Sequence, residues 1–146
     1  MLKVTGKNRR IGIYLVTLLG CLSLIFGGQT AAYAQCGIDW ACQIVDSAGN
    51  VGQYTSLAFD ASGYPAISYY DVSNGDLKLA YDQNNDGAFS AAEIITVDSS
   101  GDVGMYTSLA FGTGPAISYY DYDNGYLKLA YDRDGDGDFS DTGEII

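Results

Sequence analysis

The stretch Pro65-Ala66-Ile67-Ser68-Tyr69-Tyr70-Asp71 occurs a second time, unchanged, at residues 115–121. Further segments recur in the same order around it: 45–59 returns in closely similar form as 97–111, and 77–82 returns as 127–132. Residues 65–90 match residues 115–140 at 19 of 26 positions. Self-similarity over about fifty residues indicates a duplicated structural unit. We therefore divide this part of the chain into repeats at 45–96 and 97–146.

Each repeat predicts four short strands, which in the first copy are residues 55–59, 65–70, 77–81 and 94–97. Apolar and polar side chains alternate with a period of two, and β-branched and aromatic residues are frequent. Leu57 and Phe59 would share one face of the first strand. Turn residues such as Gly and Asn separate the strands. No segment after residue 34 predicts a helix of useful length.

Four antiparallel strands in about fifty residues, repeated, are typical of a β-propeller blade. The segments VGxYTSLAF, PAISYYD, NGxLKLAYD and DGxFS, which begin at 51, 65, 74 and 86, resemble repeats of large exported bacterial and archaeal proteins identified with β-propellers. The resemblance spans 45–146. It implies an all-β fold of two four-stranded antiparallel propeller-type blades and a surface or extracellular setting. It implies no enzymatic activity.

Two blades are fewer than the roughly four to eight that close a propeller, so the sequence predicts an incomplete one. The second repeat reaches only Ile145-Ile146, where the first continues into further residues, and we expect its last strand to be cut short. Open strand edges invite pairing with other chains. The expected alternatives are a gene fragment, self-association, or assembly with another propeller-type chain.

The first 34 residues have the three parts of a cleavable signal peptide. A basic start ends at Arg10, an apolar run covers 11–26, and Ala32-Tyr33-Ala34 forms a small-residue cleavage site. A largely apolar run of sixteen residues is short for a membrane span, which takes about 20. We predict cleavage after Ala34, no stable membrane span afterwards, and a secreted or cell-surface protein. The alternative is a lipoprotein anchored through Cys21.

The predicted mature chain is strongly acidic, with 18 acidic and 3 basic side chains and a net charge of −15. Such a surface repels nucleic acid, whose binding depends on Lys and Arg, and attracts cations. Cys36 and Cys42 remain after cleavage. In an oxidising compartment this pair predicts a disulfide that closes a small N-terminal segment at 35–44.

The sharpest chemical signal is the loop expected at 82–93. Its oxygen-bearing side chains occupy the first, third, fifth, ninth and twelfth places, with Gly at the sixth, as in a calcium-binding EF-hand loop. The flanking segments read as strands, so we expect a strand-flanked calcium loop. The predicted ligands are Asp82, Asn84, Asp86, Ser90 and Glu93.

The second copy of this loop, at 132–144, is richer in carboxylates and contains one extra residue in its second half. We expect it to bind Ca²⁺ as well. The predicted ligands are Asp132, Asp134, Asp136, Asp138, Ser140, Asp141 and Glu144. The alternative for both loops is a turn in which Asp and Asn side chains bond only their own backbone.

Eleven tyrosines follow residue 34, and Tyr70, Tyr120 and Tyr122 are candidates for stacking on a sugar or contacting a surface protein. The alternative is that they pack between blades. The chain contains no His, and Arg133 is its single Arg after residue 34, which disfavours catalytic triads and sialidase chemistry. We therefore predict a non-enzymatic structural, adhesive or binding protein. The alternatives are a carbohydrate-binding module and, less favoured, a glycoside hydrolase fragment using paired carboxylates.

Overall fold

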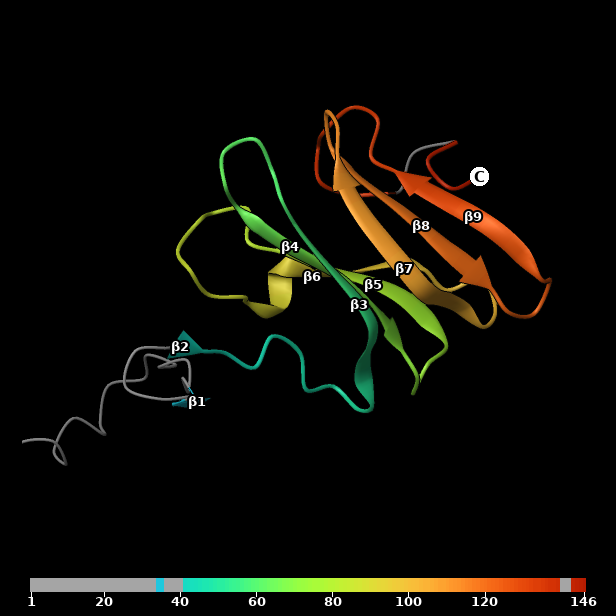
Figure 1. Cartoon of the computed structure of the whole chain (residues 1–146), viewed down its shortest axis with the longest axis horizontal. Helices are drawn as coiled ribbons and strands as arrows, with labels where there is room; N and C mark the ends of the chain where they lie inside the picture. The colour runs from blue at the N-terminus through green and yellow to red at the C-terminus, as the bar shows by residue number, and fades with distance from the viewer. Residues whose placement is uncertain (1–33, 36–40, 140–142) are drawn as a thin grey trace, which may run out of the picture. The chain divides into compact units, whose positions relative to one another are not determined.

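The computed structural model describes residues 34–35, 41–139 and 143–146 (Figure 1). Regular structure in these residues is strand, apart from one 3-10 turn, which confirms the all-β prediction. The strands form a two-stranded, a four-stranded and a three-stranded sheet. The elements are β1 Ala34–Gln35, β2 Ala41–Cys42, β3 Val51–Phe59, β4 Pro65–Asp71, β5 Asp76–Tyr81, η1 Ala91–Glu93, β6 Ile94–Asp98, β7 Val103–Phe111, β8 Pro115–Asp121 and β9 Tyr126–Tyr131.

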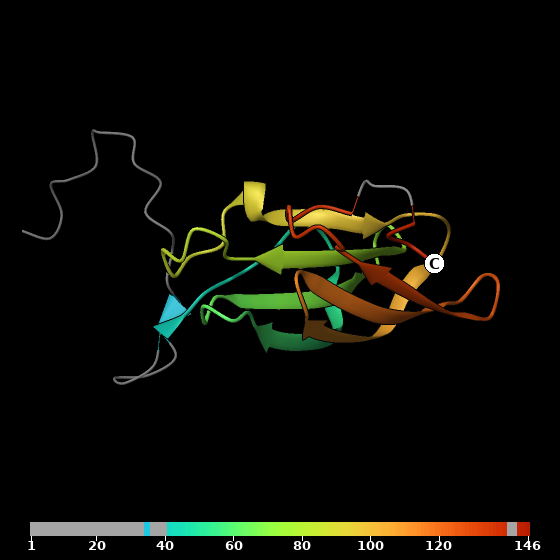
Figure 2. The same ribbon diagram turned by 90° about the horizontal axis from the view of Figure 1, so that it is seen from above.

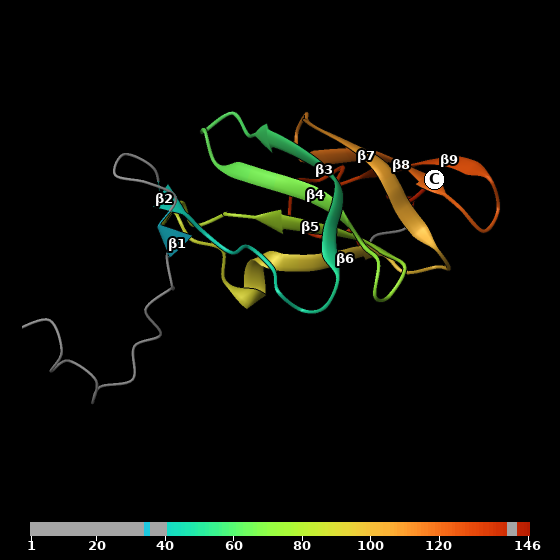
Figure 3. The same cartoon turned by 60° about the horizontal axis from the view of Figure 1, so that its bottom comes forward.

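The first large sheet is an antiparallel meander in the order β3-β4-β5-β6, which Figure 3 shows side by side. The strands predicted at 65–70, 77–81 and 94–97 lie inside β4, β5 and β6. β3 begins at Val51 rather than at Thr55, because an irregularity in the register lets the chain keep pairing with β4. Tyr54 lies at this bulge with a φ of 54°.

The second large sheet contains three strands, β7, β8 and β9, so it is not the complete four-stranded unit of the first copy, which agrees with the expectation that the last strand of the second repeat is cut short. A single bridge between Ala130 and Ile145 takes the place of the fourth strand. Backbone hydrogen bonds of 2.9 Å between Leu129 and Ile146 flank it. The Tyr131 N–H also donates to Glu144 O at 2.7 Å, so residues 144–146 lie beside β9 over a short stretch that is a bridge rather than a strand.

The two sheets pack against each other through β7, which contacts β3, β4 and β5 (Figure 2). Their facing side chains form the hydrophobic core, and burial of apolar surface is the main stabilising contribution of such a contact. The buried core residues are Ala66, Leu77, Leu79 and Val97 from the first sheet, and Val103, Leu109, Ile117, Tyr119 and Ala130 from the second.

Polar groups also join the two sheets. The Thr107 hydroxyl donates to the carbonyl oxygen of Tyr54 at 2.8 Å and lies 2.8 Å from Ser68 Oγ. The Leu109 N–H donates to Ser56 Oγ at 3.0 Å. An unsatisfied buried donor or acceptor costs about 1–3 kcal/mol, so these bonds favour one relative placement of the sheets.

Several predictions concern residues outside the described part of the chain. The signal peptide, for which we also expect a helix, lies outside the described residues except for Ala34, as do Cys21 and Cys36. Cys42 is disulfide-bonded. Its pairing with Cys36 stays a prediction. In the described residues no helix has the length and apolar character needed to cross a membrane.

Candidate metal centre

The two candidate calcium loops begin directly after the third strand of each sheet. The N–H of Asp82 donates to Pro65 O at 3.1 Å, and the N–H of Asp132 donates to Pro115 O at 3.0 Å. These bonds continue the β4–β5 and β8–β9 ladders, so the first residue of each loop is held at the sheet. Both side chains are buried, with exposed fractions of 1% for Asp82 and 0% for Asp132.

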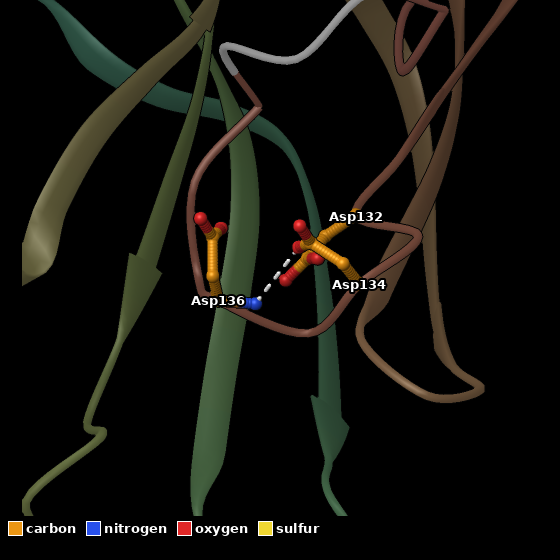
Figure 4. A group of neighbouring side chains, drawn as sticks. All are labelled: Asp132, Asp134 and Asp136. Atoms are coloured by element: carbon orange, nitrogen blue, oxygen red, sulfur yellow. Dashed lines mark hydrogen bonds between the residues drawn. The ribbon is translucent and has the colours of Figure 1, made fainter.

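Three carboxylates converge in the second loop (Figure 4). One oxygen each of Asp132, Asp134 and Asp136 lies within 4.8 Å of the others. Asp132 is buried, and Asp134 and Asp136 are exposed. The alternation of Asp with other residues turns these side chains to the same side of the loop, as the spacing predicts. Asp138 and Glu144 are described but do not belong to this group.

The sharp bends of the loops occur at their fourth and sixth residues. The φ angles are 54° at Asn85 and 77° at Gly87 in the first loop, and 78° at Gly135 and 91° at Gly137 in the second. Gly adopts positive φ without strain, and Asn tolerates it better than most residues. The sequence pattern identified the sixth position. The bend at the fourth was missed, although Asn85 and Gly135 are both residue types that permit it.

The first carboxylate organises each loop by accepting backbone hydrogen bonds. Asp132 Oδ1 accepts from the Gly135 N–H at 2.6 Å, and its Oδ2 accepts from the Gly137 N–H at 3.0 Å. Asp82 Oδ2 accepts from the Gly87 N–H at 3.1 Å. Asp82 Oδ1, however, is buried and has no hydrogen-bond partner. A buried carboxylate oxygen without a donor is costly, and a bound cation would remove that cost.

The turn-type hydrogen bonds of the alternative interpretation are also present. Asn84 Oδ1 accepts from the Asp86 N–H at 2.8 Å, and Asp86 Oδ1 accepts from the Ala88 N–H at 2.9 Å. Asp134 and Asp136 make the same bonds in the second loop. These bonds use one oxygen of each side chain, and a carboxylate can accept several. The turns therefore shape the loops without exhausting their capacity for a metal ion.

The remaining predicted ligands lie in the second half of each loop. Glu93 Oε2 accepts from the Ser90 N–H at 2.8 Å, and its Oε1 accepts from Asn84 Nδ2 at 2.9 Å, so Glu93 reaches back over the first loop. Glu144 is buried and accepts from the Arg133 N–H at 3.3 Å, at the base of the second loop. Ser140 and Asp141 lie outside the described residues.

The two lysines of the sheets form ion pairs away from the loops. In the described part of the chain, Lys78 pairs with Asp46 and Lys128 pairs with Asp98. Neither lysine pairs with the loop carboxylates. Three carboxylates within 4.8 Å repel one another, and a divalent cation is the natural counter-charge for such a group.

The candidate ligand-binding tyrosines belong to one row of neighbouring rings that differ in exposure, in the order Tyr70, Tyr54, Tyr106, Tyr120 and Tyr122. Tyr70 is 5% exposed, and its hydroxyl donates to Asp102 Oδ1. The hydrogen bond to Asp102, with burial, raises the pKa of Tyr70 to about 12. Tyr120 is half-buried, and its ring meets the exposed ring of Tyr122 edge-on at 6.4 Å. Tyr70 therefore packs between the sheets, and Tyr122 stands in solvent.

The sequence analysis did not single out two further tyrosines, Tyr54 and Tyr106. The rings of Tyr54 and Tyr106 lie 4.4 Å apart between β3 and β7, and both residues have positive φ, 54° and 55°. A hydrogen bond with Tyr106 raises the pKa of Tyr54. The recurrence of the same Tyr in both repeats was visible in the sequence, but the bulge that exposes it was not.

A scan against protein-family models finds no match to this chain, and no curated protein or solved structure matches it. The resemblance of its repeats to propeller repeats therefore stays a prediction.

Proposed function

We propose that this chain is an exported, non-enzymatic β-repeat protein whose two loops, after β5 and β9, each bind one Ca²⁺ ion and so stiffen a structural or adhesive module. The observation that carries this proposal is the unpartnered oxygen of Asp82. It belongs to the residue that corresponds to Asp132, which is one of the three carboxylates that converge in the second loop.

The chemistry of the loops suits calcium. Ca²⁺ takes six to eight oxygen ligands in flexible geometry, and both loops present alternating carboxylate or amide oxygens. In the first loop Asp82, Asn84 and Asp86 would hold the ion, with Glu93 above them. In the second, Asp132, Asp134 and Asp136 would do so. Binding would offset both the repulsion between these carboxylates and the burial of Asp82 Oδ1.

The architecture supports a propeller-type module. Each sheet is an antiparallel meander, and the two sheets pack face to face, as neighbouring blades do. Export would bring the acidic chain into contact with extracellular calcium and would allow the cysteines to pair. The signal-peptide pattern at 1–34 supports this location.

Calorimetric titration with Ca²⁺ tests the proposal, using residues 32–146, which form a compact unit by themselves. We expect two binding sites and a rise in melting temperature, because a ligand that binds only the folded state stabilises it. Mg²⁺ should bind more weakly, since it demands near-ideal octahedral geometry. The absence of both heat and a melting shift at millimolar Ca²⁺ would reject the proposal.

A pair of variants distinguishes a specific calcium site from nonspecific attraction of calcium by the net negative charge. Asp134→Asn with Asp136→Asn removes two carboxylates of the second loop, and we expect one of the two binding events to be lost. The control, Asp102→Asn with Asp123→Ser, also removes two negative charges but introduces the residues found at the same places in the first repeat. It should keep both sites. Equal losses in the two variants would mean that calcium binds only as a diffuse counter-ion.

Exposed aromatic rings favour glycan binding as a second candidate function. Tyr106 and Tyr122 are 65% and 60% exposed. Aromatic faces of this kind stack on sugar rings. A glycan array tests this candidate, with Tyr106→Ala and Tyr122→Ala as variants. Signals that survive both substitutions, or no signal above background, would remove it.

A further inference from the structure

The duplicated sequence makes the contact between the two sheets a template for a second contact. We call one side of each sheet its front face, which bears Val51, Leu57 and Ile67 in the first repeat and Val103, Leu109 and Ile117 in the second. The opposite side is the back face, which bears Ser68, Leu77 and Leu79 or Ser118, Leu127 and Leu129. Within the chain, the back face of the first sheet packs on the front face of the second.

The back face of the second sheet, which is the outer back face of the chain, exposes leucines. Their counterparts on the back face of the first sheet are buried. Leu77 and Leu79 are 0% exposed because the second sheet covers them. Their counterparts Leu127 and Leu129 are 83% and 37% exposed. Exposed leucines side by side on one strand are a sign of a contact surface rather than of an ordinary solvated face.

The front face of the first sheet, which is the outer front face of the chain, likewise exposes an apolar side chain whose counterpart in the second sheet is buried. Leu109 is 7% exposed, and its counterpart Leu57 is 59% exposed. The two outer faces of the chain thus carry the same side chains as the two faces that meet inside it. A surface that fits the back face of the second sheet is therefore already present on the front face of the first.

A hollow on the outer front face matches a leucine of the outer back face. Its volume is about 230 Å³, and its lining includes Val51, Gly52, Ile67 and Tyr69. In the second repeat their counterparts Val103, Ile117 and Tyr119 belong with Leu77 to the buried core, and a Cβ added at Gly104, the counterpart of Gly52, would lie 2.7 Å from Leu77 Cα. At Gly52 nothing lies within 4 Å of such a Cβ. The place that Leu77 fills in one repeat is open in the other.

The polar groups of the template recur as well. Inside the chain, the Thr107 hydroxyl meets Ser68, and the Leu109 N–H donates to Ser56. Their counterparts are Thr55, Ser118, Leu57 and Ser108, which are the same residue types. Thr55 and Ser108 are exposed. An outer contact can therefore form the same hydrogen bonds as the inner one.

The edge of the second sheet beside Leu127 has room for a residue that corresponds to Asp98. In the first sheet Leu77 pairs with Asp98 on β6. Its counterpart Leu127 pairs with Tyr120 of β8, and no strand pairs with it on the other side in the described residues. The counterpart of Asp98 is Asp46, just before β3. Docking of a second front face would bring Asp46 beside Leu127.

We propose that copies of this chain associate head to tail, with the front face of the first sheet of one copy on the back face of the second sheet of the next. Leu127 enters the hollow beside Gly52 of the neighbouring copy. Such a contact is heterologous, so it closes into a ring when the rotation permits. With two sheets per copy, the four to eight blades of a closed propeller correspond to two to four copies. The contact does not depend on calcium binding.

Sedimentation of residues 32–146 over a range of concentrations tests the proposal. We expect one discrete species of two to four copies, and salt should strengthen it because the copies are acidic. Leu127→Lys should give monomers. The control Tyr126→Lys changes the neighbouring exposed residue, whose side chain points to the other side of β9, and should leave the mass unchanged. A wild-type monomer at every concentration would overturn the proposal.

Mixing two variants distinguishes head-to-tail docking from a symmetric dimer. Leu57→Lys and Leu127→Lys should each be monomeric, because each has lost one of the two faces. Together they retain one intact pair of faces, so the mixture should form a species of twice the monomer mass. Circular dichroism and urea unfolding confirm that both variants are folded. An assembly that survives Leu57→Lys, or a mixture that stays monomeric, would contradict head-to-tail docking.

Discussion

Asp98 ends strand β6 of the first sheet, yet its carboxylate accepts a hydrogen bond of 2.5 Å from Lys128 Nζ on strand β9 of the second. The Tyr119 hydroxyl donates to the same oxygen at 2.6 Å. Asp46, Tyr69 and Lys78 make the same three-residue arrangement one repeat earlier. Asp98 therefore links the two sheets.

Loss of this link should destabilise the fold. We expect Asp98→Asn to lower the free energy of unfolding by about 3 kcal/mol. Removal of one partner of a buried ion pair leaves the other charge, here that of Lys128, without a counter-charge. Urea unfolding at one protein concentration measures this. The exposed control Asp123→Asn should change stability by less than about 0.5 kcal/mol. Similar values for the two variants would show that Asp98 is not a link.

Stability should fall in acid through the same carboxylates. Burial alone would raise the pKa of Asp46, but hydrogen bonds from Lys78 and Tyr69 outweigh it and lower the pKa to about 2. The pKa of Asp98 is also lowered, against the effect of burial, by Lys128 and Tyr119. Because the pKa of an unfolded Asp is about 3.9, this stabilisation is complete above that pH and is lost as pH falls towards about 2.

Variants of the two carboxylates test this pH dependence. Unfolding free energies measured between pH 5 and pH 2 should fall less steeply for Asp46→Asn with Asp98→Asn than for the wild type, because the variant cannot lose these charges. An unchanged slope would assign the acid sensitivity to other groups.

Buried tyrosines should resist ionisation in alkali. Burial and the hydrogen bond to Asp60 raise the pKa of Tyr81 to about 12, and the bond to Asp102 raises that of Tyr70 to about 12. Burial also raises the pKa of Tyr69 and Tyr119. Their contribution to stability is present below the ordinary pKa of about 10 and is lost as pH rises towards about 12.

An absorbance titration of tyrosinate checks this expectation. We expect two phases, an early one from exposed rings such as Tyr122 and a late one that coincides with unfolding. Asp102→Asn should move one tyrosine towards the early phase. A single phase at the ordinary pKa would contradict the buried hydrogen bonds.

Two glycines offer a matched test of the sheet contact. Gly104 and Gly52 are counterparts with φ of 104° and 88°, so Ala is strained at both. A Cβ at 104 would also lie 2.7 Å from Leu77 Cα, whereas one at 52 meets nothing within 4 Å. Gly104→Ala should therefore cost about 1–3 kcal/mol more than Gly52→Ala in urea unfolding of monomeric chains in the Leu127→Lys background. Equal costs would mean that backbone strain alone matters.

Much of the fold could be predicted because it depends on residues close together in the chain. The alternation around Ile67 and Leu79 predicts strands, and the spacing of Asp132, Asp134 and Asp136 predicts their convergence. The three-stranded second sheet could not be predicted in this detail, since backbone pairing beside β9 depends on where Ile145 meets Ala130. The buried oxygen of Asp82 that lacks a hydrogen-bond partner could not be predicted from the sequence either, because it depends on which atoms surround the loop.

Leu77 and Leu127 mark the limit of what the sequence by itself determines. Both lie in the same sequence, Leu-Lys-Leu-Ala-Tyr-Asp, and both belong to the same strand of the repeat. Local pattern sets the strand, the side on which each side chain points and the position of the loop. Burial depends on atoms that come from another sheet. Only the tertiary structure decides that Leu77 is covered by β7 and that Leu127 is left open.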